Sequence, residues 1–326
     1  MKKVICLLLS VVLTVGLLAG CQQTPQSQET TATPTTEATQ PTESAQEAKA
    51  LKIMILGSSR SVNAFQLLYE AFQDQMPDQE VVLGIMYYSG CSMTMHTDFI
   101  KNNECVYDYY RNNDGRWEIQ RGVHMAYGLQ DQNWDVVVLQ AGNGDLENEM
   151  NKPCREFLTD YVDGILKEHP HVFWWHSTWT NSTDPSLYDS SKTKLNPYTI
   201  DQYAQLTSGI DAAKAYVLED PMFAGHVTSG TPMMYALKVL EIPEVELYRD
   251  HTHLSDFGCL LVAYAWYAQF TGNPVTEIKL EYVRKDLRHS QYQYMGDMFV
   301  TQQMKDYIIK TVEYTLNNPW SVPVKE

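Results

Sequence analysis

The sequence predicts an α/β fold, a three-layer α/β/α sandwich with a central, mostly parallel sheet. Two patterns support this prediction. From residue 51 onward, short apolar runs alternate with segments of helical periodicity, and several runs end at glycine-bearing turns. Such alternation is typical of right-handed βαβ units whose parallel sheet is covered on both faces. With 44% hydrophobic residues, a chain of this length can bury one large core.

The first predicted unit is a strand over residues 51–56, a tight turn at Gly57-Ser58-Ser59, and a helix with apolar residues up to Phe72. A second strand over 81–88 ends at the turn Ser89-Gly90-Cys91. Next, Asn112-Asn113-Asp114-Gly115 lies between two strand-like segments and predicts a hairpin, because Asp-Gly tolerates the positive φ of such turns. We interpret this hairpin as a small insertion.

A third apolar strand over 135–139 again stops at a glycine-rich turn, 140–145. The remaining elements are predicted as helices over 157–166, 200–217, 232–240 and 254–270, and as strands over 171–175, 223–227 and 245–248. In open parallel sheets, ligands bind beyond the carboxyl ends of the strands. The turns after the first three strands therefore converge on one candidate site.

The N-terminus predicts export. Residues 1–20 carry two lysines, then an apolar run that is too short for a transmembrane helix. Leu18-Ala-Gly-Cys21 resembles the lipobox of bacterial lipoproteins, in which the signal peptide is cut before a cysteine that then carries lipid. Residues 21–49 are thus expected to be the lipidated Cys21 and a disordered Thr/Pro/Ser/Gln linker. Residues 50–326 form the predicted domain, held outside the cytoplasm and on the bacterial cell membrane only through the lipid.

Net charge and the pattern of cysteines and histidines limit the partners, metals and cofactors that we expect for the domain. Loss of residues 1–20 moves the formal net charge from −16 to −18, and such an acidic body repels phosphate backbones, so we expect no nucleic-acid partner. No Cys or His pattern has metal-ligand spacing, and we expect neither a metal nor a cofactor. The domain keeps four cysteines, for which disulfides and free thiols both stay open: Cys91, Cys105, Cys154 and Cys259.

One serine and one acid–base pair carry the predicted chemistry. Ser59 follows the first strand, and Asp250-His-Thr-His253 precedes the last long apolar helix. A serine hydroxyl becomes a good nucleophile only when a base removes its proton, and a third group must orient that base. His253 would accept the Ser59 proton, and Asp250 would orient the imidazole.

Several stretches, in this order, resemble the conserved blocks of SGNH or GDSL-like serine hydrolases, within a gut-bacterial lipoprotein branch. They are Ile55-Leu-Gly-Ser-Ser-Arg-Ser-Val-Asn-Ala64, Ser89-Gly-Cys-Ser92, Trp134-Asp-Val-Val-Val-Leu-Gln140, Thr178-Trp179 and Tyr248-Arg-Asp-His-Thr-His-Leu-Ser-Asp-Phe-Gly258. The resemblance implies a flavodoxin-like SGNH hydrolase fold with Ser59 as the nucleophile. It also implies that the oxyanion is bound by the N–H groups of Ser59 and Gly90 and by an asparagine of the third block.

The third block departs from the family pattern. The Gly-x-Asn-Asp pattern would place the asparagine at Gly144, whereas this chain has Asn143 one position earlier. Asn143 is our first candidate for the third oxyanion donor, and Gln140 is the alternative. Two residues are candidates for substrate binding: Trp179 as an aromatic platform for a sugar, and Arg60 as a contact to an anionic group or else a solvated surface residue.

We therefore expect an extracytoplasmic esterase that hydrolyses acyl esters, such as O-acetyl groups on carbohydrate, through an acyl-enzyme. Its partner would be a small-molecule or carbohydrate ester, and we expect a monomer. Two alternatives remain open at this point. One is a ligand- or glycan-binding lipoprotein on the same fold without activity, and the other is an O-acyltransferase that keeps the triad.

Overall fold

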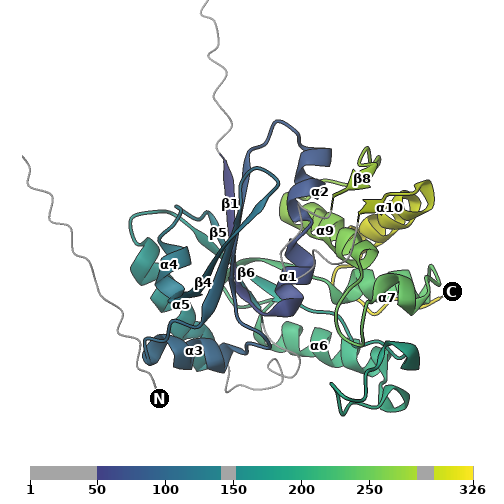
Figure 1. The fold of residues 1–326 in the computed structure, drawn as a ribbon, viewed down its shortest axis with the longest axis horizontal. Coiled ribbons are helices and arrows are strands. Elements are labelled where there is room, and N and C mark those ends of the chain that lie inside the picture. Colours follow the sequence, from purple (N-terminus) through teal and green to yellow (C-terminus); the bar gives the residue numbers. More distant parts are fainter. Residues whose placement is uncertain (1–49, 141–151, 285–296, 326) are drawn as a thin grey trace, which may run out of the picture. The chain divides into compact units, whose positions relative to one another are not determined.

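A seven-stranded sheet runs through the centre of the domain, with helices on both faces (Figure 1). The structure is a computed structural model that describes residues 50–140, 152–284 and 297–325. The strands are β1 (Leu51–Gly57), β2 (Val81–Tyr87), β3 (Tyr107–Asn112), β4 (Trp117–Val123), β5 (Val136–Gln140), β6 (Val172–Ser177) and β7 (Phe223–Thr228). The α-helices are α1 (Ser59–Phe65), α2 (Leu68–Gln75), α3 (Met93–Lys101), α4 (Met125–Leu129), α5 (Lys152–Leu166), α6 (Gln202–Tyr216), α7 (Gly230–Lys238), α8 (Glu244–Leu247), α9 (Asp256–Thr271) and α10 (Gln302–Asn317).

The strand order is β4-β3-β2-β1-β5-β6-β7. Strands β2, β1, β5, β6 and β7 are parallel, in the doubly wound order of flavodoxin-like folds, and this confirms the predicted fold class. The β3–β4 hairpin forms at the predicted Asp-Gly turn and is an addition to the doubly wound order of the parallel strands. It pairs antiparallel with β2 and extends the main sheet, because the edge of β2 offers unpaired backbone groups.

Both faces of β1 are buried, and its side chains alternate between two cores. Ile53 and Ile55 belong to the core beneath α1, α2 and α9, whereas Met54 and Leu56 belong to the core beneath α3 and α5. This alternation follows from the two-residue period of a strand. Parallel strands covered on both faces appear in the sequence as continuous apolar runs, which is why β1, β2 and β5 were predictable.

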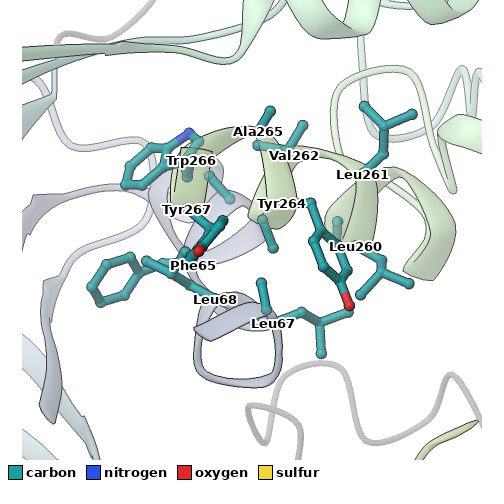
Figure 2. Close-up of a cluster of buried hydrophobic side chains, with 14 of the residues drawn as sticks. Phe65, Leu67, Leu68, Leu260, Leu261, Val262, Tyr264, Ala265, Trp266 and Tyr267 are labelled. Carbon is teal, nitrogen blue, oxygen red and sulfur yellow. The ribbon is translucent and has the colours of Figure 1, made fainter. Parts of the chain in front are cut away.

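Helix α9 is the central element of the first core. Its residues from Phe257 to Ala268 are buried, and it packs against α1 and α2 (Figure 2). Ser255 caps the start of the helix, because its hydroxyl accepts the N–H of Gly258, and Gly272, with a φ of 72°, caps its end. A helix that is apolar on all sides must be surrounded by protein. The position of the chain just before α9 is therefore fixed by a large apolar contact.

Two sequence predictions about elements were wrong. Residues 245–248 do not form a strand: Glu244–Leu247 is the short helix α8, because Pro243 starts a turn and the N–H of Tyr248 donates to the carbonyl of Glu244. The helix predicted after Ser59 is broken into α1 and α2 at residues 66–67. The sequence prediction also omitted α3, α4, α10 and the small ribbon of β8 (Tyr282–Val283) and β9 (Met298–Phe299). Among the described helices, none has the length and apolar character needed to cross a bilayer.

We predict that Trp266→Ala lowers the free energy of unfolding by about 3–5 kcal/mol, the usual cost of removing a large buried aromatic side chain. Trp266 is fully buried, its ring contacts Phe65, and its Nε1–H donates to Ser229 Oγ at 2.8 Å. Urea denaturation of residues 50–326 measures the change. Phe299→Ala is the control, because Phe299 is 74% exposed and its loss should cost less than about 0.5 kcal/mol. Equal losses for both variants would contradict this account of the core.

Candidate active site

Ser59 is the first residue of α1 and lies directly after the carboxyl end of β1. The turn that presents it is tightly packed, since a Cβ on Gly57 would lie 2.1 Å from Ser61 Oγ. From β5, the side-chain carbonyl of Gln140 accepts hydrogen bonds from Ser58 N–H at 3.1 Å, Ser58 Oγ at 2.9 Å and Ser61 Oγ at 2.5 Å. Neighbouring strands thus hold the serine turn, at the point where the sheet changes winding direction.

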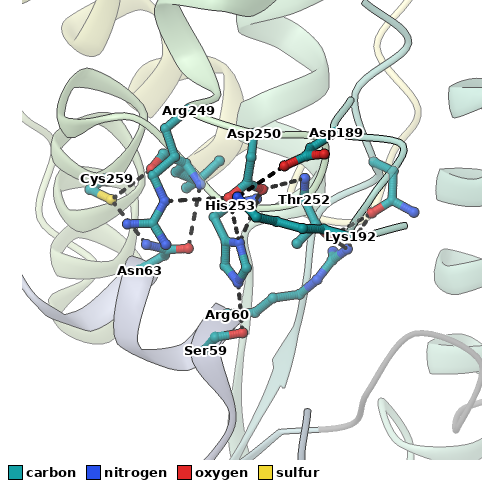
Figure 3. A network of polar contacts seen from close by, with 12 residues as sticks. Ser59, Arg60, Asn63, Asp189, Lys192, Arg249, Asp250, Thr252, His253 and Cys259 are labelled. Carbon is teal, nitrogen blue, oxygen red and sulfur yellow. Dashed lines mark hydrogen bonds and ion pairs between the residues drawn. The ribbon is translucent and has the colours of Figure 1, made fainter. Parts of the chain in front are cut away.

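The structure brings together the three residues predicted as a triad (Figure 3). His253 Nε2 lies 2.9 Å from Ser59 Oγ, within hydrogen-bonding distance. On the other side of the ring, His253 Nδ1 lies 2.9 and 3.0 Å from the two carboxylate oxygens of Asp250. With the Nδ1 proton donated to the carboxylate, Nε2 is left to accept the serine proton.

The loop that carries Asp250 and His253 is a closed turn. The N–H of Arg249 donates to the carbonyl of His253 at 3.0 Å, and Tyr248 forms an isolated β-bridge with Leu254. Within the turn, Asp250 Oδ1 also accepts the backbone N–H groups of residues 252 and 253, at 2.9 and 2.8 Å. Because Asp250 and His253 are three residues apart, the same carboxylate can both stabilise the loop and orient the imidazole.

Hydrogen bonding decides the charge state of Asp250. Burial alone would raise the pKa of this carboxyl group, but the hydrogen bond from the His253 side chain, the electrostatic attraction of His253 and the hydrogen bonds from the backbone N–H groups of Thr252 and His253 together outweigh it. The pKa of Asp250 is therefore held well below its usual range. The carboxylate remains ionised in mildly acidic and neutral solution, as an orienting group for an imidazolium must.

The four candidate oxyanion donors differ in where the structure places them. The N–H of Ser59 is at the start of α1, where helical N–H groups lack intrahelical acceptors. Gly90 is exposed, with a φ of 62°, in the turn after β2, and its turn borders the serine turn because Tyr88 N–H donates to the carbonyl of Gly57. Asn143 lies outside the described residues. Gln140 is buried, with its carbonyl beneath the serine turn, so its clear role is to position that turn.

The structure corrects the expectations for Arg60 and Trp179. Arg60 is only 7% exposed, so it is not a solvated surface residue, and its guanidinium donates to the carbonyl of Trp179 and to the side chains of Asn181 and Thr252. Trp179 is 1% exposed and its Nε1–H donates to the carbonyl of Thr252 at 2.9 Å. A covered indole offers no face for stacking a sugar. Both residues join loops within the protein.

Sequence reasoning missed the residues that hold these loops. Glu244 accepts hydrogen bonds from the side chains of Ser182 and Thr183 and from the N–H groups of residues 183 and 184. Burial would raise the pKa of Glu244, but these hydrogen bonds lower it. Behind the histidine loop, Gln66 Nε2 donates to Cys259 Sγ at 2.8 Å. Gln66 was detectable as a polar residue on an apolar helix face, whereas no local pattern marks Glu244.

Metal ligands and cysteines add little to this site. In the described ranges, no three His, Cys, Asp or Glu side chains are grouped as a metal site. Cys154 and Cys259 are free thiols, and burial raises the pKa of Cys259 to about 12, so its thiol is protonated and inert at neutral pH.

Comparison with solved structures gives similar folds. A DUF4886 family protein from Bacteroides uniformis has a TM-score of 0.66 and 21% sequence identity, covering 84% of this chain and 98% of that one. A proposed SGNH hydrolase from Slackia heliotrinireducens has a TM-score of 0.41 and 14% identity, covering 68% and 100%. A variant of an acetyl xylan esterase from Geobacillus stearothermophilus has a TM-score of 0.41 and 11% identity, covering 71% and 98%.

The match to the Bacteroides protein supports the α/β fold of the chain. Among curated proteins, none matches the sequence significantly. The model of one protein family, a domain of unknown function named DUF4886, matches residues 52–293, which is most of the chain. The chain therefore belongs to the DUF4886 family.

Proposed function

We propose that this protein is a serine esterase in which Ser59, His253 and Asp250 form the catalytic triad. One observation carries the proposal. Ser59 Oγ lies 2.9 Å from His253 Nε2, and Asp250 Oδ2 lies 2.9 Å from His253 Nδ1. A hydroxyl, an imidazole and an ionised carboxylate in this order form the arrangement that activates serine nucleophiles on unrelated folds. His253 is 24% exposed at the side chain, so a substrate can approach the pair from solvent.

In the first half of the proposed reaction, Ser59 Oγ attacks the ester carbonyl carbon while its proton moves to His253 Nε2. The carbonyl oxygen becomes an oxyanion, for which the N–H groups of Ser59 and Gly90 are the proposed donors. The carbon–oxygen bond to the alcohol then breaks, and the leaving alcohol takes the proton from His253. An acyl group is left on Ser59.

In the second half, water attacks the acyl carbonyl carbon and gives its proton to His253. The bond to Ser59 Oγ breaks, the serine regains the proton, and a carboxylic acid is released. Asp250 remains ionised throughout and stabilises the imidazolium each time it forms. We propose an acyl ester of a small molecule or a carbohydrate as the substrate class, O-acetyl groups included.

We also propose that the enzyme works outside the cytoplasm, anchored through a lipid on Cys21. The support is the sequence of residues 1–21, with its lysines, its apolar run and its lipobox-like end. An anchored esterase would meet substrates at the cell surface.

The first prediction concerns the nucleophile. Residues 50–326 should release p-nitrophenol from p-nitrophenyl acetate, and Ser59→Ala should lower kcat at least about a thousandfold while the circular dichroism spectrum stays unchanged. Ser208→Ala, at an exposed serine on α6, is the matched control and should retain activity. A folded, fully active Ser59→Ala variant would exclude Ser59 as the nucleophile.

The second prediction concerns pH. Since the pKa of Asp250 is lowered well below its usual range, this carboxylate keeps its charge in mildly acidic solution, so only the general base of the proposed triad can lose activity there by taking up a proton. As the pH falls below neutral, log(kcat/KM) should therefore decline with a slope of one. A slope of two would mean that a second group titrates, and activity unchanged down to pH 4 would rule out a histidine base.

The third prediction concerns the anchor. When the full chain is expressed in a bacterium, it should partition with the membrane fraction and incorporate labelled palmitate. Cys21→Ser should abolish the label and release the protein, because the lipid that would be attached to Cys21 is then missing. Membrane association that survives Cys21→Ser would contradict anchoring through this residue.

A further inference from the structure

The residue after the proposed nucleophile is a buried arginine, and burial of a guanidinium needs a physical reason. Arg60 is 7% exposed, and burial lowers its pKa to about 10, which still leaves it charged at neutral pH. Removing such a charge from water is costly unless good hydrogen bonds compensate for it. An apolar residue on α1 would avoid that cost, so the guanidinium must make contacts that such a residue cannot.

The contacts of Arg60 reach two loops. One nitrogen donates to the carbonyl of Trp179, and the other donates to Asn181 Oδ1 at 2.6 Å and to Thr252 Oγ1 at 2.7 Å. The guanidinium also lies 5.3 Å from the centre of the Trp179 ring. Residues 179 and 181 follow β6, whereas residue 252 belongs to the loop of the proposed triad, so Arg60 joins α1 to both loops. Figure 3 shows Arg60 and Thr252 in the same network of polar contacts.

The two loops are also bonded to each other around the guanidinium. Thr252 Oγ1 donates to Asn181 Oδ1 at 2.7 Å, and Trp179 Nε1–H donates to the carbonyl of Thr252 at 2.9 Å. Thr252 is the residue between His251 and His253, and its own N–H donates to Asp250 at 2.9 Å. A shift of Thr252 would therefore move the imidazole and the carboxylate together relative to Ser59.

We propose that Arg60 is a positioning residue: its guanidinium fixes the loop of Asp250 and His253 against the helix that carries Ser59. This inference rests on the proposed esterase function. It adds that the hydrogen bonds of Arg60 set the distance between the Ser59 hydroxyl and the His253 imidazole. Arginine suits this role because its planar guanidinium donates in several fixed directions at once. The lysine ammonium is a compact charge without that planar geometry.

The test compares Arg60→Lys and Arg60→Met with Arg155→Met. Arg155 is a matched control: it is 3% exposed, on α5, donates to the carbonyl of Tyr216 at 3.2 Å, and contacts neither loop of the proposed site. With p-nitrophenyl acetate, kcat should fall about 10-fold in Arg60→Lys and about 100-fold in Arg60→Met, with KM changed less than about threefold, because a misplacement near 1 Å has effects of this size. Arg155→Met should keep the wild-type kcat.

A second measurement does not depend on turnover. Hydrogen exchange of the peptide that covers residues 249–255 should accelerate in both Arg60 variants and remain at the wild-type rate in Arg155→Met. Should Arg60→Met not fold, Thr252→Val removes the hydroxyl that accepts from Arg60 and donates to Asn181, and it should lower kcat several-fold with KM unchanged.

Unchanged kcat in the folded Arg60 variants, or a change confined to KM, would overturn the proposal, since the latter result indicates a substrate contact. The failure of the esterase proposal would look different. In that case the wild type and Ser59→Ala would be equally inactive, and faster exchange of residues 249–255 in the Arg60 variants would still support the positioning role, whereas unchanged exchange would overturn it.

Discussion

The contact between α1 and α9 is the constraint on which the proposed site depends. Ser59 begins α1, and the loop with Asp250 and His253 ends where α9 begins, so the separation of these helices fixes the distance between hydroxyl and imidazole. The two residues are 194 positions apart in sequence. Burial of apolar surface drives this contact but has no direction. Directed hydrogen bonds must therefore set the final geometry, and those of Gln66, Asp250 and Arg60 are placed to do so.

Close backbone packing keeps the histidine loop short. A Cβ on Gly258 would lie 2.2 Å from the carbonyl oxygen of Leu247, so the first turn of α9 approaches α8 more closely than a side chain allows. Glu244, at the start of α8, accepts four hydrogen bonds from residues 182–184. The loop after β6 and the histidine loop are consequently held by the same short helix. Together the two loops and α8 form a frame beside the helix that carries Ser59.

The sequence predicted the sheet and the triad for different reasons. Strands buried on both faces are continuous apolar runs, which local sequence shows. Ser59 and His253 belong to short motifs next to apolar segments, so these two residues could also be predicted from local sequence. It failed where a residue's environment depends on distant partners. Trp179 was expected as an aromatic platform for a sugar, and Arg60 as a contact to an anionic group or a solvated surface residue. In the structure, polar groups of the loops pair around both side chains and cover them. The strand-like residues over 245–248 predicted a strand, but Pro243 starts a helical turn over Glu244–Leu247.

Burial distinguishes the polar groups that hold the loops of the site in place from the groups that a substrate can contact. Gln140 and Arg60, on the two sides of the serine turn, are 1% and 7% exposed and use side-chain atoms on the protein's own loops. Asp250 is 39% exposed at its side chain, and Gly90 is exposed. A buried group that is already hydrogen-bonded gains little by turning to a ligand, because its present partner would lose its bond. If the proposed esterase activity holds, selectivity for one ester over another then resides in the exposed rim, and the buried polar groups serve the geometry of the proposed reaction.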